Sequence, residues 1–334
     1  MIQPIWKDAW ISLGTGNSAT FDLVVGGNII YTGKAQRKPD SEEIRIRIND
    51  IVAAYLGNEL PARGKGVFTE TPYLCQVSVQ VNGTEVENIT FGNDWSYDYD
   101  HDIETDGLAC PINGKVSALA PVVVSVLRAE SVRMTAHFTD GTSAFQMISL
   151  QQMADFNADF NIDFSKENLR ENGTGAVAFD LGIFSKEIAS VEIDGQTFEV
   201  SPCGDFVLYY VNAFGGWDTF LLDKLVKRRD TLTRHERGRL YDNSDSSDRG
   251  RDNYLNEIVR QLELHTGWLS DEQSLKMHHL LNSTCVYLWD IARQRMFPLV
   301  LTDTTTEHKT YKGEGRTLIN YTINAEIAQD FIRR

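Results

Sequence analysis

The chain has 334 residues, enough for two or three domains that each bury a core of their own. Hydrophobic residues make up 42% and charged residues 24%, which argues against a wholly disordered chain. The formal net charge of -15 argues against wrapping of DNA, or docking on an anionic membrane, by the whole molecule, because like charges repel.

The longest apolar runs, such as residues 118–127, have the length of a strand and are too short for a membrane-spanning helix. The first ten residues lack the basic start and apolar segment of a signal peptide, so we expect the protein to fold in a cytoplasm. Its cysteines are far apart and form no CxxC pair, which favours free thiols over zinc ligands or disulfides. They are Cys75, Cys110, Cys203 and Cys285.

Several runs in the chain up to residue 205 have strand character, and some alternate apolar and polar residues with period two, as half-buried strands do. Glycine turns separate these runs, at Gly26-Gly27, Asn82-Gly83, Asp140-Gly141 and Asp194-Gly195. Strands are predicted at residues 20–25, 29–31, 44–48, 74–81, 84–91, 115–126, 132–138, 142–150, 190–193 and 196–200. A short helix over residues 51–56 is expected to begin at a cap formed by Asn49 or Asp50.

The last third has a different pattern. Residues 206–214 are an apolar, tyrosine-rich strand, and residues 227–256 are polar with little apolar periodicity, which predicts a long loop or arm. Ser270 is expected to cap a helix over about residues 270–282, with Asp271 and Glu272 in its first turn. Further strands are predicted at residues 285–289, 296–302 and 317–323.

These elements predict a mainly β protein of tandem sandwich-like or barrel-like domains. We expect an N-terminal β domain over residues 1–95, an acidic linker loop over 96–109 and a central β-sandwich over 110–205. The C-terminal β domain, residues 206–334, carries the flanking helix and the long inserted arm.

Motifs of common enzyme classes are absent: there is no GxSxG, no GxxxxGK[ST] and no HExxH. The adjacent pair His278 and His279 would point about 100° apart on a helix, which does not suit one metal ion. The sequence therefore predicts a protein that is not an enzyme and needs no cofactor.

The acidic loop that precedes the central domain places carboxylates at alternate positions, as a calcium-binding loop can. Its glycine comes late, however, and no glutamate closes the loop at the twelfth position, so it is not an EF-hand. A solvated acidic loop is the favoured interpretation and calcium the alternative. The candidate ligands are Asp98, Asp100, Asp102, Glu104 and Asp106.

The segment from Lys224 to Arg239 is basic, in contrast to the acidic chain as a whole. It contains seven lysine and arginine residues and two acidic residues, Asp230 and Glu236, so its net charge is 7 − 2 = +5. Such an arm could dock on an acidic neighbour, including another copy of this chain, or it could be a solvated loop. Nucleic acid is a weaker alternative, because the stretch has no aromatic residue for base stacking before Tyr241. The candidate assembly residues are Lys227, Arg228, Arg229, Arg234, Arg237 and Arg239.

A structural corner is predicted at Gly215, Gly216, Trp217 and Asp218. The two glycines permit a sharp reversal at the end of a strand, and Gly216 is the one that we expect to need a positive φ. Trp217 would fold back on the sheet, while Asp218 would accept hydrogen bonds from the amides of the turn. A ligand pocket on Trp217 is the alternative.

The corner also carries a resemblance. Residues 208–218, which read LYYVNAFGGWD, resemble a run in virion proteins of tailed bacteriophages and prophages of Bacteroidetes. The similarity continues along the C-terminal half and touches the N-terminus, and it is strongest after residue 206. It includes residues 264–273, 281–288, 297–303 and 318–323, together with 34–40 and 48–56.

This resemblance implies a structural protein of the tail or baseplate, made in the cytoplasm of the bacterial host, with no catalytic residues to carry over. The expected partners are other copies of the chain, in a ring for which six copies is one option, and other tail proteins, with no membrane and no sequence-specific nucleic acid. A receptor-binding or glycan-binding tail module is the alternative, because Trp95, Tyr97 and Tyr99 could stack on sugar rings.

Overall fold

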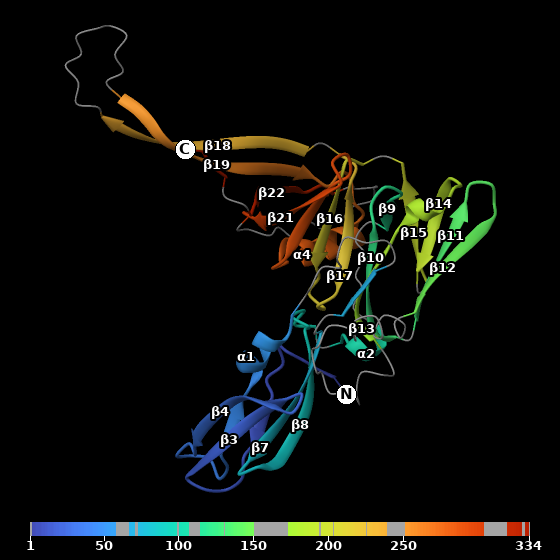
Figure 1. Cartoon of the computed structure of the whole chain (residues 1–334). Coiled ribbons are helices and arrows are strands. Elements are labelled where there is room, and N and C mark those ends of the chain that lie inside the picture. The colour runs from blue at the N-terminus through green and yellow to red at the C-terminus, as the bar shows by residue number, and fades with distance from the viewer. Residues whose placement is uncertain are drawn as a thin grey trace. The chain divides into compact units, whose positions relative to one another are not determined.

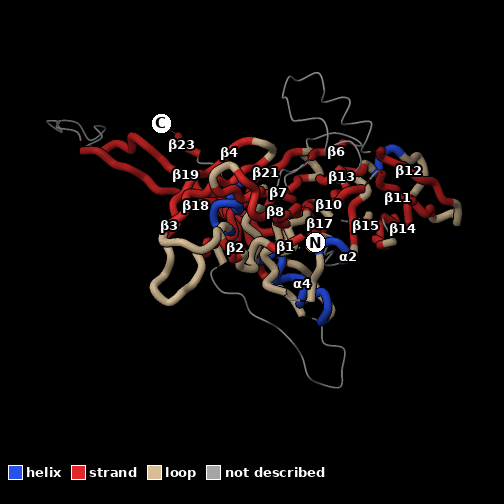
Figure 2. Tube along the Cα trace, turned by 90° about the horizontal axis from the view of Figure 1, so that it is seen from below, coloured by secondary structure: helices blue, strands red, loops and turns tan. Residues whose placement is uncertain are grey.

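The computed structural model describes thirteen segments of the chain. They are residues 2–57, 67–70, 73–98, 100–106, 114–129, 131–149, 173–193, 195–202, 204–224, 226–238, 251–303, 319–328 and 331–333. Strands account for 60% of the structure and helices for 8%, which confirms the predicted mainly β class. Figure 2 shows how few and short the helices are.

The fold consists of two compact units. The first contains residues 1–201 and the segment 211–219, and the second contains residues 202–210 and 220–334. The predicted boundary between residues 95 and 110 lies inside the first unit, and the predicted boundary at 206 lies beside the start of the second. The finer division into three domains stays a prediction. Along the described segments, no helix has the length and apolar character needed to cross a bilayer.

The N-terminal part of the first unit is built on a five-stranded sheet in the order β1-β8-β7-β3-β4, of which Figure 1 labels β8, β7, β3 and β4. A two-stranded sheet of β2 and β5 accompanies it. One apolar core joins both sheets, and Leu23, Ile48 and Phe91 are completely buried in it. The strands are β1 (Ile2–Pro4), β2 (Trp10–Ser12), β3 (Ser18–Val25), β4 (Asn28–Gln36), β5 (Arg45–Arg47), β7 (Leu74–Val81) and β8 (Thr84–Gly92).

The predicted tight hairpins of this sheet are confirmed, since Asn82 has φ 53° and Gly83 has φ 77°. The helix comes earlier than predicted, as α1 (Asn49–Val52) followed by a 3-10 turn η1 (Ala53–Tyr55). The predicted cap is wrong: Ile48 occupies the cap position and no side chain caps the helix. The Asn49 side chain instead accepts from the Ala9 amide and donates to the carbonyls of Ile5 and Lys7, because the buried N-terminal segment has polar groups to satisfy.

The rest of the first unit is a β-sandwich of a three-stranded sheet, β10-β13-β6, and a five-stranded sheet, β12-β11-β14-β15-β9. Apolar side chains of both sheets form one buried cluster, which includes Val126, Met134, Val177 and Val191. The elements are β6 (Val67–Glu70), α2 (Ile103–Asp106), β9 (Lys115–Ser117), β10 (Val122–Ala129), β11 (Ser131–Phe138), β12 (Ser143–Ser149), β13 (Gly173–Phe179), η3 (Leu181–Ile183), β14 (Ile188–Ile193) and β15 (Gln196–Ser201).

The second unit is built on most of an eight-stranded sheet in the order β17-β16-β20-β21-β22-β19-β18, with β23 also paired to β19. The last residue of β16 and the first three residues of β17 fall in segment 211–219 of the first unit. Helix α4 (Asp271–Leu281) begins at the predicted cap, where Ser270 and Gln273 form a reciprocal capping box. The strands are β16 (Phe206–Val211), β17 (Trp217–Leu222), β18 (Val226–Gly238), β19 (Arg251–His265), β20 (Val286–Asp290), β21 (Arg295–Leu301), β22 (Thr322–Ile327) and β23 (Phe331–Arg333).

The predicted loop over residues 227–256 is wrong, because its described residues form most of an antiparallel hairpin of β18 and β19. The side chains on both faces of β18 are nearly all exposed. Since neither face is buried, the strand does not show the apolar alternation of a half-buried strand. The hairpin is held instead by its backbone ladder and by cross-strand side-chain pairs.

Candidate functional site

The β18–β19 hairpin of the second unit extends beyond the other strands of its sheet (Figure 1). The two strands stay in register from Val226 opposite Leu264 to Gly238 opposite Arg251, with one bulge after His235. β22 and β23 flank β19 only from residue 256 onward, and no described strand pairs with the outer edge of β18. β18 is therefore a 13-residue edge strand whose outward backbone groups are open to another strand.

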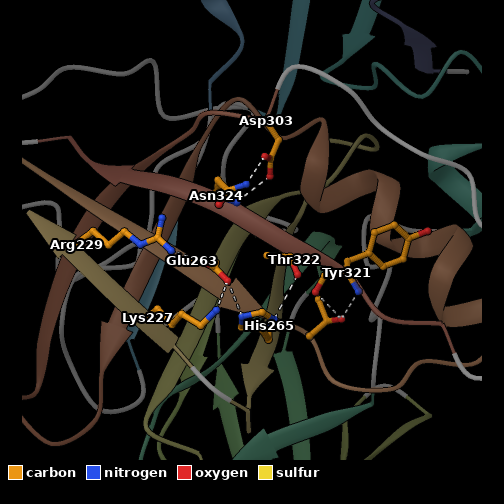
Figure 3. Close-up of polar contacts among 9 residues, drawn as sticks. Lys227, Arg229, Glu263, His265, Asp303, Tyr321, Thr322 and Asn324 are labelled. Carbon is orange, nitrogen blue, oxygen red and sulfur yellow. Dashed lines mark hydrogen bonds and ion pairs between the residues drawn. The ribbon is translucent and has the colours of Figure 1, made fainter. Parts of the chain in front are cut away.

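The base of the hairpin carries a network centred on Glu263 (Figure 3). Lys227 donates to its carboxylate at 2.6 Å, Arg229 lies 3.4 Å away and the His265 ring nitrogen lies 3.1 Å away. The hydrogen bond from Lys227 holds the pKa of Glu263 below its usual value. Lys227 and Arg229 therefore stabilise the pairing of β18 with β19 within the chain.

Arg228 is also held inside the second unit. Its guanidinium lies over the ring of Phe206 at 5.1 Å and contacts the buried carboxylate of Asp290 at 3.5 Å. Burial raises the pKa of Asp290, but hydrogen bonds from Arg293, one of 2.6 Å, outweigh burial and leave that pKa below its usual value. Arg228 therefore completes the neutralisation of a buried acid.

The outer half of the hairpin differs. Asp230 and Arg260 form a loose, exposed pair at 3.9 Å, and Arg234 and Arg237 form no ion pair with any described residue. Arg239 lies outside the described residues. Of the predicted assembly residues, the structure therefore leaves Arg234 and Arg237 exposed for a partner.

Acids of β19 offset part of the basic charge that the sequence shows on β18. β18 carries five cations and two carboxylates, 5 − 2 = +3, and β19 carries two cations and three carboxylates, 2 − 3 = −1. Apolar side chains are also exposed on the ribbon: Leu232 at 49%, Tyr254 at 51% and Val259 at 37%. The hairpin thus presents mixed charge and apolar groups, a composition suited to protein contact.

A polar hollow of about 280 Å³ lies beside the hairpin base, lined by Arg229, Gln261, Leu262, Glu263, Thr302, Asp303, Asn324 and Ala325. Figure 3 shows that its acids are already engaged. Asp303 accepts from the backbone and side-chain nitrogens of Asn324 at 2.7 and 2.8 Å, and Glu263 is held as described above. Because both carboxylates of the hollow are already bound to nitrogen atoms of the chain, we assign the hollow no ligand.

The candidate calcium ligands whose side chains the structure describes do not converge on a metal site. The side chain of Asp98 accepts from the Asp100 amide at 3.0 Å and that of Asp102 from the Glu104 amide at 3.0 Å, so they close turns of the loop. The side chain of Asp106 lies outside the described residues. Within the described segments, no three His, Cys, Asp or Glu side chains gather as a metal site would require.

The predicted corner is present, with its roles placed differently. Gly215, not Gly216, has the positive φ, of 88°, and a Cβ on Gly215 would lie 2.2 Å from the carbonyl oxygen of Asn93. The expectation for Gly216 is therefore wrong, because the chain reverses one residue earlier. Trp217 is completely buried and its amide donates to Ser125, which makes the corner structural and leaves no pocket on Trp217.

Asp218 and Asn212 form the polar centre of the corner. Asn212 donates to the Asp218 carboxylate at 2.9 Å, and its side-chain oxygen accepts from the Gly216 amide at 2.9 Å. The Asn212 side chain thus links the Asp218 carboxylate to the Gly216 amide. The direct hydrogen bonds expected from the amides of the turn to Asp218 stay a prediction.

Sequence reasoning missed the residues that hold the corner in the first unit. The His101 ring stacks on Phe214 at 3.7 Å and lies 3.3 Å from the buried carboxylate of Asp94. The Trp95 amide also donates to the carbonyl of Ala213 at 2.7 Å. No sequence pattern joins residues 94–101 to residues 213–214, because the contact is long-range.

Comparisons with protein-family models, curated proteins and solved structures found no match to this chain.

Proposed function

We propose that the chain is a non-catalytic structural protein of a bacteriophage virion, a tail or baseplate component that assembles with copies of itself and with other tail proteins. The observation that supports it is the β18–β19 hairpin. A 13-residue open edge with exposed Arg234, Arg237 and Leu232 is a surface for protein contact and offers no chemistry for a reaction.

The assembly mechanism follows from edge pairing and charge. An open edge adds a neighbour's strand by backbone hydrogen bonds, and repeated head-to-tail contacts close into a ring. The whole chain has a net charge of -15, whereas β18 carries +3. The acidic surface of a second copy therefore attracts β18, although the acidic surfaces of two copies repel each other. Acidic walls around a channel also let DNA pass without trapping it.

The test uses particles purified from the phage or prophage that encodes the chain. Peptide mass spectrometry should find the chain in intact, nuclease-treated particles at a copy number typical of a tail component. Negative stain of the purified chain should show concentration-dependent rings. Particles that lack the chain would refute the proposal.

A second candidate function is glycan recognition by the first unit. Trp95 and Tyr97 are 46% and 65% exposed, and a hydrogen bond from the Trp95 indole to Asn93 at 2.9 Å fixes the Trp95 ring. Exposed, fixed aromatic rings can stack on sugars. Tyr99 lies outside the described residues. Binding of the intact chain to a glycan array, lost in Trp95→Ala, would favour this function over assembly alone.

A further inference from the structure

The sequence of β18 is complementary to itself around Leu232. If a second copy of the strand runs antiparallel with Leu232 opposite Leu232, Asp230 lies opposite Arg234 and Thr231 opposite Thr233. Each of these pairs occurs twice because the arrangement is two-fold symmetric. Opposite charges and threonine pairs are favourable neighbours across an antiparallel ladder.

The next positions agree with this register on the face of Leu232, where Arg228 lies opposite Glu236. On the other face Arg229 lies opposite His235 and Lys227 lies opposite Arg237. Glu263 reduces the repulsion on this second face within each copy, because its carboxylate binds Lys227 at 2.6 Å and lies 3.4 Å from Arg229.

Neighbouring two-fold registers are worse. A shift of the two-fold centre by one residue brings Arg228 opposite Arg234 in one direction and Asp230 opposite Glu236 in the other. The charges therefore discourage unspecific pairing, as charges on edge strands commonly do, and favour one register.

We propose that two copies of the chain pair through the outer edges of β18, antiparallel and centred on Leu232, so that their two sheets become continuous. The occupant of this edge is a second copy because the strand complements its own charge pattern. The contact deepens the edge pairing of the proposed function. It closes after two copies and so links subunits in pairs, leaving ring closure to other surfaces.

Charge exchange tests the register. In the full chain, Arg234→Asp places one carboxylate opposite Asp230 at each of the two symmetric contacts and should weaken dimerisation about tenfold, measured by sedimentation velocity. Adding Asp230→Arg to the same chain exchanges the charges and should restore the wild-type dimer. Both side chains are exposed, so melting curves should show that the variants fold. A double variant that stays as weak as Arg234→Asp would overturn the register.

Cross-linking tests the symmetry centre. Leu232→Cys places two thiols directly opposite each other, with Cβ atoms about 5 Å apart, and mild oxidation should give a covalent dimer. His235→Cys is the matched control, because position 235 lies six residues along the strand from its copy, about 20 Å away. The wild type, with its own cysteines, should not cross-link. Cross-linking of both variants alike, or of neither, would overturn the proposal.

The outcome is separable from that of the virion proposal. A chain that is monomeric at the highest soluble concentration refutes the β18 pair even if it is found in particles. A dimer with this register in a chain absent from particles leaves the pair standing and removes the virion function.

Discussion

Replacing Gly215 by alanine should destabilise the first unit more than the same change at any free turn. Gly215 has φ 88°, a backbone conformation that costs a residue with a side chain about 1–2 kcal/mol of folding free energy. Its new Cβ would also lie 2.2 Å from the carbonyl oxygen of Asn93, so the two backbone segments must separate. That movement strains the hydrogen bond of 2.7 Å from Trp95 to Ala213, which contributes about 1 kcal/mol.

The expected loss is about 2–3 kcal/mol for the two effects together. A unit of this size loses roughly 2–4 °C for each kcal/mol, so its transition should fall by about 4–12 °C in differential scanning calorimetry. The measurement should follow the two units separately, because they are compact on their own.

Gly141→Ala is the matched control. Gly141 has φ 80°, but no atom lies within 4 Å of an added Cβ, so only the backbone cost of about 1–2 kcal/mol applies. Equal falls in melting temperature for the two variants would show that the close approach to Asn93 contributes nothing, and the account of the corner would be wrong.

Three further predictions follow from the second unit and the cysteines. Glu263→Gln should remove a pH-dependent part of the stability, because the hydrogen bond from Lys227 keeps the pKa of Glu263 low in the folded state. In melting curves recorded over a series of pH values, the wild type should be more stable than the variant above the usual glutamate pKa of about 4.3. This difference should disappear as the pH falls through the lower folded pKa. Arg234→Glu with Arg237→Glu should leave the melting temperature within about 1 °C but block incorporation into particles, whereas normal incorporation would make the hairpin end a solvated ribbon. Denatured protein should titrate four free thiols, while in the native state Cys75, whose pKa burial raises to about 11, should react with a thiol reagent only on unfolding; two or fewer thiols would contradict a reducing compartment.

The sequence was sufficient to predict elements whose rules are local. The turn at Asn82-Gly83 needs positive φ at both positions, and only such residues adopt it cheaply. Ser270 and Gln273 mark the start of α4 because the capping box is a property of four consecutive residues. Strands of β7 and β8 were visible because one face of their sheet is buried.

Features that depend on distant residues could not be predicted. β18 has no buried face, and its identity as a strand rests on pairing with β19 across residues outside the described part. The internal role of Lys227 became visible only when Glu263 was placed opposite it. Likewise, the need for glycine at position 215 arises from the Asn93 carbonyl, more than a hundred residues away in sequence.

We propose that the chain is a subunit of a virion tail and assembles through its β18–β19 hairpin. Cryo-electron microscopy of purified particles, with the chain traced into the density, is the decisive experiment. We expect several copies in the tail or baseplate, with β18 buried against a neighbouring subunit. Particles with no density for the chain, or copies whose β18 edge faces solvent on every side, would contradict this proposal.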